Sequence, residues 1–141
     1  MTQEIIVKAS SLFLRTGALA AIFGMGLGIS MGITQDHTLR SVHAHINLVG
    51  WASMFLFGLY YHVVPAADSK LAKIHYYVAL PGFLAMMAGV AGLMLGNGSF
   101  EPLAIVGSLV TFASMLIFAW NVFSTTKSSA ASKPAAVAPA R

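Results

Sequence analysis

The sequence contains no cysteine, and charged residues make up only 9% of its 141 positions. Without cysteine, the chain can form no disulfide, zinc-thiolate site, iron–sulfur cluster or covalent c-type haem attachment. A soluble domain usually has about 25% charged residues, so polar side chains are too few here to cover a water-facing fold. Hydrophobic residues make up 57% of the chain, and its mean hydropathy is +0.79. The composition therefore predicts a membrane protein of one domain.

Four stretches are long and apolar enough to cross a bilayer, for which a helix needs about 20 residues. Uncharged runs, separated by short polar segments with turn residues, occupy positions 16–35, 41–67, 74–100 and 102–126. Short connections make successive helices antiparallel neighbours. We expect an all-α domain of four transmembrane helices over residues 1–126. A low-complexity tail follows over residues 127–141, whose composition predicts disorder.

The positive charges lie almost entirely on one side of this four-helix arrangement. Only Arg40 falls on the other side, against seven lysines and arginines: Lys8, Arg15, Lys70, Lys73, Lys127, Lys133 and Arg141. Cytoplasmic loops carry the excess of Lys and Arg in membrane proteins. Both termini are therefore expected in the cytoplasm, and the chain is expected in the bacterial inner membrane.

Glycines recur every four residues in the first expected helix, at Gly24, Gly28 and Gly32. Small residues at this spacing allow the backbone of another helix to approach closely. The alternative is that glycine is simply common in membrane helices. The eight methionines are scattered through the apolar runs, and we interpret them as core residues rather than a copper path.

The second expected helix carries two histidines close together, His43 and His45. Ionisable side chains within a bilayer are costly, so each needs a role. Two positions apart on an α-helix, they point about 200° apart, so they cannot bind one metal ion together. They can instead reach two sites, one on each side of the helix. A lone membrane histidine is more often a hydrogen-bonded structural residue.

The segment from Asp36 to Pro65 resembles the tenth transmembrane helix of subunit I in the haem-copper oxidase superfamily. That helix has a His-x-His pair, an aspartate seven residues before it, and a glycine and His-x-x-Pro at its end. The matching positions are Asp36, His43, His45, Gly58, His62 and Pro65. A looser similarity, carried by Asn47, Trp51, Tyr60-Tyr61 and Pro65, links the segment to the second helix of nitric oxide reductase catalytic subunits.

The resemblance implies that His43 and His45 are axial ligands of haem b groups on opposite faces of the helix. The family subunit is built as three similar four-helix arcs, so this chain is similar to one arc. A homo-oligomer, most simply a trimer, would restore the architecture, with His43 of one protomer facing His45 of the next. No further histidines match the family's copper ligands, so the usual binuclear centre is not expected.

Several neighbouring residues are candidates for supporting a haem. Arg40 is placed to pair with a propionate, and Asn47 to orient a ligand or bond across helices. In the family, an acid and a histidine at the positions of Asp36 and His37 lie near the propionates and a magnesium ion. The alternative is a helix start at which Asp36 or Thr38 is the cap.

At the opposite end, His62 and His75 lie near four tyrosines, Tyr60, Tyr61, Tyr76 and Tyr77. His62, His75 and His37 are further candidate iron ligands, and a second haem would allow electrons to cross the membrane. The competing interpretation is that these side chains anchor the protein at the membrane interface.

These observations predict a membrane haem b protein that carries electrons, because two histidine ligands leave no iron position for a substrate. One alternative is a haem protein that binds or reduces nitric oxide or oxygen, as an enzyme or sensor. The other is a protein without haem, whose histidines bind copper or hydrogen-bond between helices. The lipid bilayer and further copies of the chain are the expected partners, with an electron donor and acceptor that the sequence does not name. No nucleic acid is expected.

Overall fold

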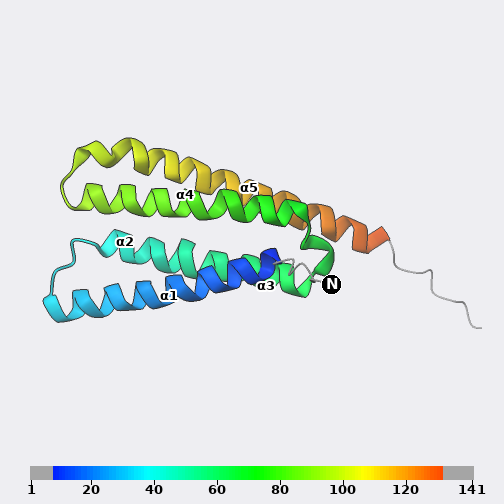
Figure 1. Cartoon of the computed structure of the whole chain (residues 1–141), viewed down its shortest axis with the longest axis horizontal. Helices are drawn as coiled ribbons and strands as arrows, with labels where there is room; N and C mark the ends of the chain where they lie inside the picture. Colours follow the sequence, from blue (N-terminus) through cyan, green and yellow to red (C-terminus); the bar gives the residue numbers. More distant parts are fainter. Residues whose placement is uncertain (1–7, 132–141) are drawn as a thin grey trace, which may run out of the picture.

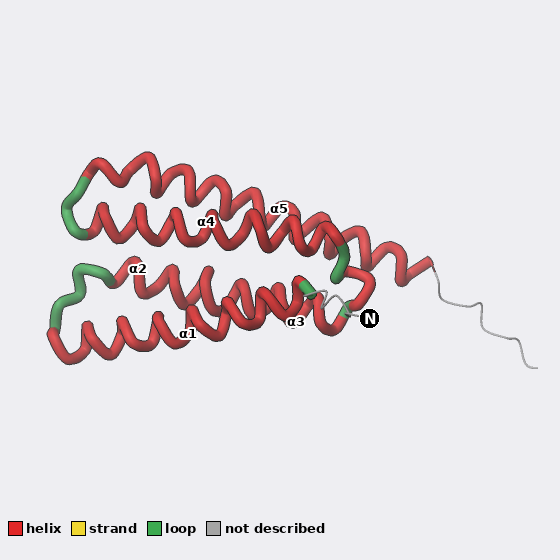
Figure 2. The backbone as a smooth tube through the Cα atoms, in the orientation of Figure 1, coloured by secondary structure: helices red, strands yellow, loops and turns green. Residues whose placement is uncertain are grey.

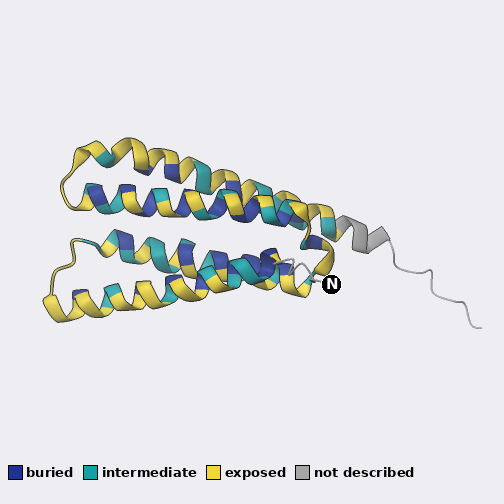
Figure 3. Cartoon of the chain, in the orientation of Figure 1, coloured by how far each residue is buried: buried dark blue, intermediate teal, exposed yellow. Residues whose placement is uncertain are grey.

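The computed structural model describes residues 8–131, which form an all-helical bundle with no strand in that range (Figure 2). Four helices are long and apolar enough to cross a membrane, at Ala9–Thr34, Arg40–Val63, Lys70–Met94 and Gly98–Thr126. The four predicted spans are thereby confirmed. Much of their apolar surface faces outward (Figure 3), as with Ile33, which is 79% exposed, and Trp120, which is 71% exposed. Exposed apolar surface of this extent fits a lipid environment.

Helix α1 spans Ala9–Thr34 and begins seven residues before the predicted span. The carboxylate of Asp68 accepts hydrogen bonds from the backbone N–H groups of Ala9 (3.1 Å) and Ser10 (3.4 Å). It therefore satisfies two of the donors that a helix start leaves unpaired. Because this partner is 58 or 59 residues away, the start of α1 depends on the tertiary fold. The helix ends where Gln35 adopts a left-handed conformation, with φ 56°.

The second transmembrane helix, here called helix 2, consists of three sections in unbroken succession. They are α2 (Arg40–His45), a π-helical section (Ile46–Ser53) and α3 (Met54–Val63). The hydroxyl of Ser53 donates to the carbonyl of Leu48, five residues earlier, at 2.8 Å. Helix 2 stops before Pro65, which starts a short 3₁₀ turn to Ala67, because the residue before proline is disfavoured in helical geometry.

Helix α4 spans Lys70–Met94, starting after Ser69, whose side chain accepts from the N–H of Leu71. A second 3₁₀ turn, Gly98–Phe100, leads into α5, which spans Glu101–Ala131. Helix α5 thus extends five residues into the segment predicted as a tail, and residues 132–141 lie outside the described part. The predicted span of 74–100 is corrected to an earlier end, since the helix ends at Met94 and Gly96 takes a φ of +84°.

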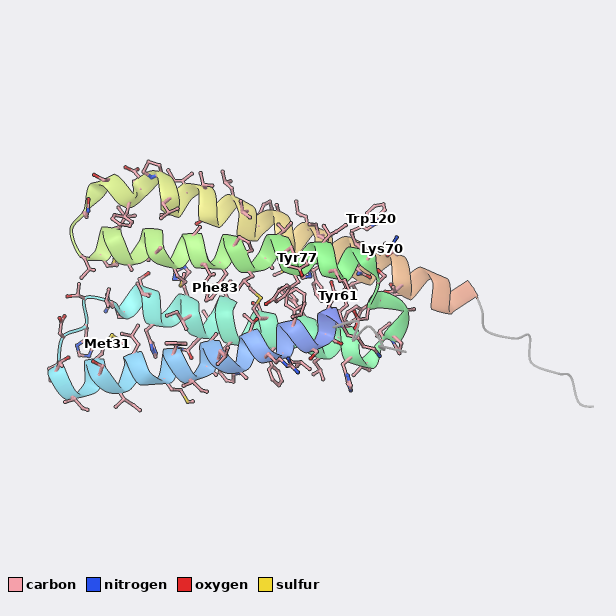
Figure 4. All side chains as sticks on the ribbon, viewed as in Figure 1. Met31, Tyr61, Lys70, Tyr77, Phe83 and Trp120 are labelled. Carbon is pink, nitrogen blue, oxygen red and sulfur yellow. The ribbon has the colours of Figure 1, made fainter. Side chains whose placement is uncertain are left out.

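The helices form two antiparallel hairpins that lie side by side, α1 with helix 2 and α4 with α5 (Figure 1). Glycines allow close approach within both pairs: Gly89 packs on the backbone of Ala104 between α4 and α5, and Gly17 on that of Phe55 between α1 and helix 2. Between the hairpins, Phe83 of α4 packs against Gly50 of helix 2 (Figure 4).

The expectation for the methionines holds in part, since Met31, Met54, Met86 and Met87 are buried but Met25, Met94 and Met115 are exposed.

Candidate functional site

The candidate site lies at the α2 end of the bundle, where α1 and helix 2 meet (Figure 1). The glycines of α1 were expected to allow another backbone to approach, but at Gly24 and Gly28 the space is filled by side chains of helix 2. A Cβ atom added to Gly24 would lie 2.7 Å from the side-chain amide of Asn47, and one added to Gly28 would lie 2.8 Å from Cε1 of His43. Gly32 has nothing within 4 Å. Gly24 and Gly28 therefore provide the surface on which His43 and Asn47 rest.

His43 is oriented by a hydrogen bond to α1. Its Nδ1 atom lies 2.9 Å from the carbonyl oxygen of Gly24. Because a carbonyl oxygen only accepts, Nδ1 carries the proton, and in the neutral ring the lone pair is on Nε2. The side-chain amide of Asn47 donates to the backbone carbonyl of His43 at 2.8 Å. Asn47 therefore hydrogen-bonds within helix 2 and contacts α1 by packing. The predicted hydrogen bond across helices is not among those of the described residues.

His45 is oriented in the same way by a different partner. Its Nδ1 atom lies 2.8 Å from the carbonyl oxygen of Ser41, one turn earlier on helix 2. Nδ1 is again the donor and Nε2 the free nitrogen. Both histidines are half-buried, and neither Nε2 has a hydrogen-bond partner or is fully buried among the described residues.

The two rings point away from each other, since both residues lie in the regular α2 section before the π-helical section begins. His43 faces α1. A hollow of about 290 Å³ lies between helix 2, α4 and α5, and its lining includes Val49, Phe57, Ala79, Thr111 and Met115. Along helix 2 the hollow runs from Val49 to Phe57, beyond both histidines, and neither His43 nor His45 is among its lining residues.

Sequence reasoning missed the π-helical section that starts directly after His45. π-Helical sections are rare in proteins, and those that do occur often lie at functional sites. In the sequence, Ile46–Ser53 looks like any apolar helical stretch. The nearest signal is Gly50, which accommodates the ring of Phe83 within 2.5 Å of where its Cβ would be.

The loop before α2 does not match the alternative interpretation, in which Asp36 or Thr38 caps the helix. The N-cap position is Leu39, without a side-chain cap, so neither Asp36 nor Thr38 is the cap. Asp36 instead closes a turn, because its Oδ1 accepts from the N–H (2.9 Å) and hydroxyl (2.6 Å) of Thr38. These hydrogen bonds, the hydroxyl first, lower the pKa of Asp36. The Nδ1 atom of His37 bonds to Gln35, and Arg40 is exposed at the start of α2.

At the opposite end of the bundle, His75 lies in an aromatic cluster formed by Phe13, Phe57, Tyr61, His75 and Phe118. The side chain of His75 is 0% exposed, and its Nδ1 is 2.9 Å from the hydroxyl of Tyr61. The rings of Phe13 and Phe57 are each 4.7 Å from it, centroid to centroid. Interfacial anchoring is therefore wrong for His75 and Tyr61, which are core residues. His62 is exposed and outside this cluster.

Two atoms within the described residues are buried without a hydrogen-bond partner, Nε2 of His75 and the hydroxyl of Thr111. No group of three or more His, Asp or Glu side chains in residues 8–131 is arranged to hold a metal ion.

No protein-family model, curated protein or solved structure matches this chain. The functional conclusion therefore rests on the chemistry of the residues themselves.

Proposed function

We propose that this chain is a membrane protein that holds haem b through His43 and His45 and carries electrons. The observation that supports this most is the state of the two imidazoles. In each, Nδ1–H donates a hydrogen bond to a backbone carbonyl, and Nε2 has no partner among the described residues. Histidines that ligate metals usually donate their other ring N–H to a carbonyl or carboxylate in this way. The donor set therefore fits a haem iron.

The divergence of the two rings decides how many chains are needed. One haem cannot be bound by both histidines of one α2, so a haem with two imidazole ligands requires His43 of one protomer and His45 of another. A closed ring of identical contacts supplies such pairs, and a trimer is the arrangement implied by the similarity to haem-copper oxidase subunit I.

The remaining residues of the site have supporting roles in this proposal. Arg40, one turn before His43, pairs with a propionate. Gly24 and Asn47 fix the ring of His43 from two sides. The bound haem supplies one-electron chemistry, with its potential set by axial ligands and burial. The excess of cations near the N-terminal ends of α1 and α4 supports cytoplasmic termini in a bacterial inner membrane.

One observation favours a second candidate function, a haem protein that binds nitric oxide or oxygen. The ring of His43 is already packed against α1, close to Gly28, and hydrogen-bonded to Gly24. A haem held by His45 alone has an open axial position, which a diatomic gas can occupy.

Absorption spectra of the detergent-purified protein, oxidised and dithionite-reduced, test both functions. Electron transfer predicts sharp reduced α and β bands that carbon monoxide does not shift. A carbon monoxide-sensitive spectrum supports the gas-binding function instead. If no Soret band appears after expression with ample haem, the protein does not bind haem, and the histidines have a structural role.

A further inference from the structure

A second feature, unrelated to the histidines, is an apolar groove between α1 and α4. Its walls include Leu19 and Phe23 from α1, and Leu80 and Leu84 from α4, with Ile46 of helix 2 at its base. Its volume is about 260 Å³. Phe23 is 71% exposed and Leu84 is 55% exposed, so the groove is open to its surroundings. Within a membrane, those surroundings are lipid chains.

The groove has one polar end. There the hydroxyl of Thr16, which lines the groove, lies 2.9 Å from the hydroxyl of Tyr76 and joins α1 to α4. This is the end at which both helices begin, because Asp68 caps α1 and Phe13 packs on His75 nearby. From Thr16 to Phe23 the α1 wall rises about 10 Å along the helix axis, so the groove leads from the membrane surface into the bilayer.

Two cations precede the lining residues in the sequence, one on each of the two helices, although neither is itself a lining residue. Lys73 precedes Leu80 by seven residues and Leu84 by eleven, so it lies on the same stripe of α4. Arg15 precedes Leu19 by four residues on α1 and is exposed. Asp68 is the acidic side chain at this end in the described part, and Ala9 and Ser10 already occupy its carboxylate. Within residues 8–131, the carboxylate of Asp68 therefore hydrogen-bonds to the start of α1 and not to Arg15 or Lys73.

We propose that this groove binds an anionic phospholipid, with one acyl chain along the apolar walls and the phosphate between Arg15 and Lys73. Charge at the mouth and hydrocarbon surface beyond it match the two parts of such a lipid. Haem is a poorer match because no histidine lines the groove. A second copy of the chain is a poorer match because it would bury Arg15 and Lys73. The inference does not depend on the proposed haem function.

Native mass spectrometry of the purified protein, exposed to equal amounts of phosphatidylglycerol and phosphatidylcholine with the same acyl chains, tests the proposal. We expect preferential retention of one phosphatidylglycerol per chain. The variant Lys73→Gln should weaken it about fivefold, and Arg15→Gln should add a similar factor. Lys73→Arg should retain binding. Lys70→Gln removes an equal charge from the same end, off the groove stripe, and serves as the matched control.

Leu84→Trp, or Leu19→Phe if that variant is not recovered, fills the groove and should abolish retention of the lipid while the charges remain. Equal retention of the two lipids would overturn the proposal. So would an effect of Lys70→Gln as large as that of Lys73→Gln, because it would indicate unspecific attraction. If filling the groove removes haem or changes the oligomeric mass while lipid retention persists, the groove belongs to haem or to another copy, and the proposal fails.

Discussion

The two ends of the bundle use histidine in opposite ways. At the α2 end, His43 and His45 are half-buried, bonded through Nδ1 to backbone carbonyls, and have a free Nε2. At the other end, His75 is fully buried, bonded to a tyrosine hydroxyl, and enclosed by aromatic rings. In the first pair, the lone pair of Nε2 is not used by the described residues. The second is part of the packed core, so residue type alone does not identify a site.

The largest expected effect comes from removing a helix-2 histidine. His43→Ala or His45→Ala should leave the protein without haem or with high-spin haem, because each proposed interface needs both rings. Reduced absorption spectra with haem quantification measure this, and exposed His62→Ala is the control that should retain wild-type bands. If His45→Ala loses haem while His43→Ala has no effect, haem is not shared between protomers.

At the opposite end, replacement of His75 should affect stability and not the spectrum. His75→Ala leaves a cavity among Phe13, Phe57 and Phe118, for which a loss of about 3 kcal/mol in the free energy of unfolding is expected. Thermal unfolding in detergent, followed by circular dichroism, measures the change. A loss of haem at unchanged stability would instead place His75 in the cofactor site and remove the contrast between the two ends.

Tyr61→Phe is a milder change in the same cluster. It removes the hydroxyl that bonds to Nδ1 of His75, and leaving a buried polar atom unpaired costs about 1–3 kcal/mol. The same unfolding experiment tests it, and Tyr77→Phe, which alters an exposed ring (67%), is the matched control. Equal effects of the two variants would show that the bond to His75 contributes nothing.

The contact between α1 and His43 gives a smaller and more local prediction. Gly28→Ala places a methyl group 2.8 Å from Cε1 of His43, so the ring must shift. We expect altered haem bands or weaker haem binding, by about tenfold, as for other residues that orient a ligand. Gly32→Ala adds the same methyl group where nothing lies within 4 Å and should leave the spectrum unchanged. If the haem spectra of Gly28→Ala and Gly32→Ala are the same, Gly28 does not position His43.

The smallest effect is expected in the loop before α2. The pKa of Asp36 is below its ordinary value of 3.8, because Thr38 bonds to the ionised carboxylate. As the pH falls, Asp36 is protonated in the unfolded chain at a higher pH than in the folded chain. The stabilisation by Asp36 is therefore complete above the ordinary value and is lost as the pH falls through the folded-state pKa. A carboxyl NMR titration measures this, and a midpoint at or above 3.8 would contradict it.

The sequence was sufficient for the features that depend on local composition. It predicted the four spans from uncharged runs, and it singled out His43 and His45 from their cost in a bilayer. It also marked Gly24 and Gly28 as contact positions, although side chains of helix 2 and not its backbone occupy them, and Gly32, on the same spacing, has nothing within 4 Å.

Features that depend on residues far apart in the sequence could not be predicted from local composition. The start of α1 is fixed by Asp68, a residue of the connection between helix 2 and α4. The burial of His75 follows from Phe13, Phe57 and Phe118, which come from three other helices. The π-helical section has no marker in its composition. Packing between helices, which has no periodic signal of its own, determines each of these.

The most direct test of the central claim is addition of haem b to the haem-free purified protein, followed through the Soret band. The wild-type chain should bind haem and give a six-coordinate, low-spin spectrum, and the double variant His43→Ala/His45→Ala should not. Equal binding by the wild-type chain and the double variant, or no binding by either, would contradict the assignment of His43 and His45 as haem ligands.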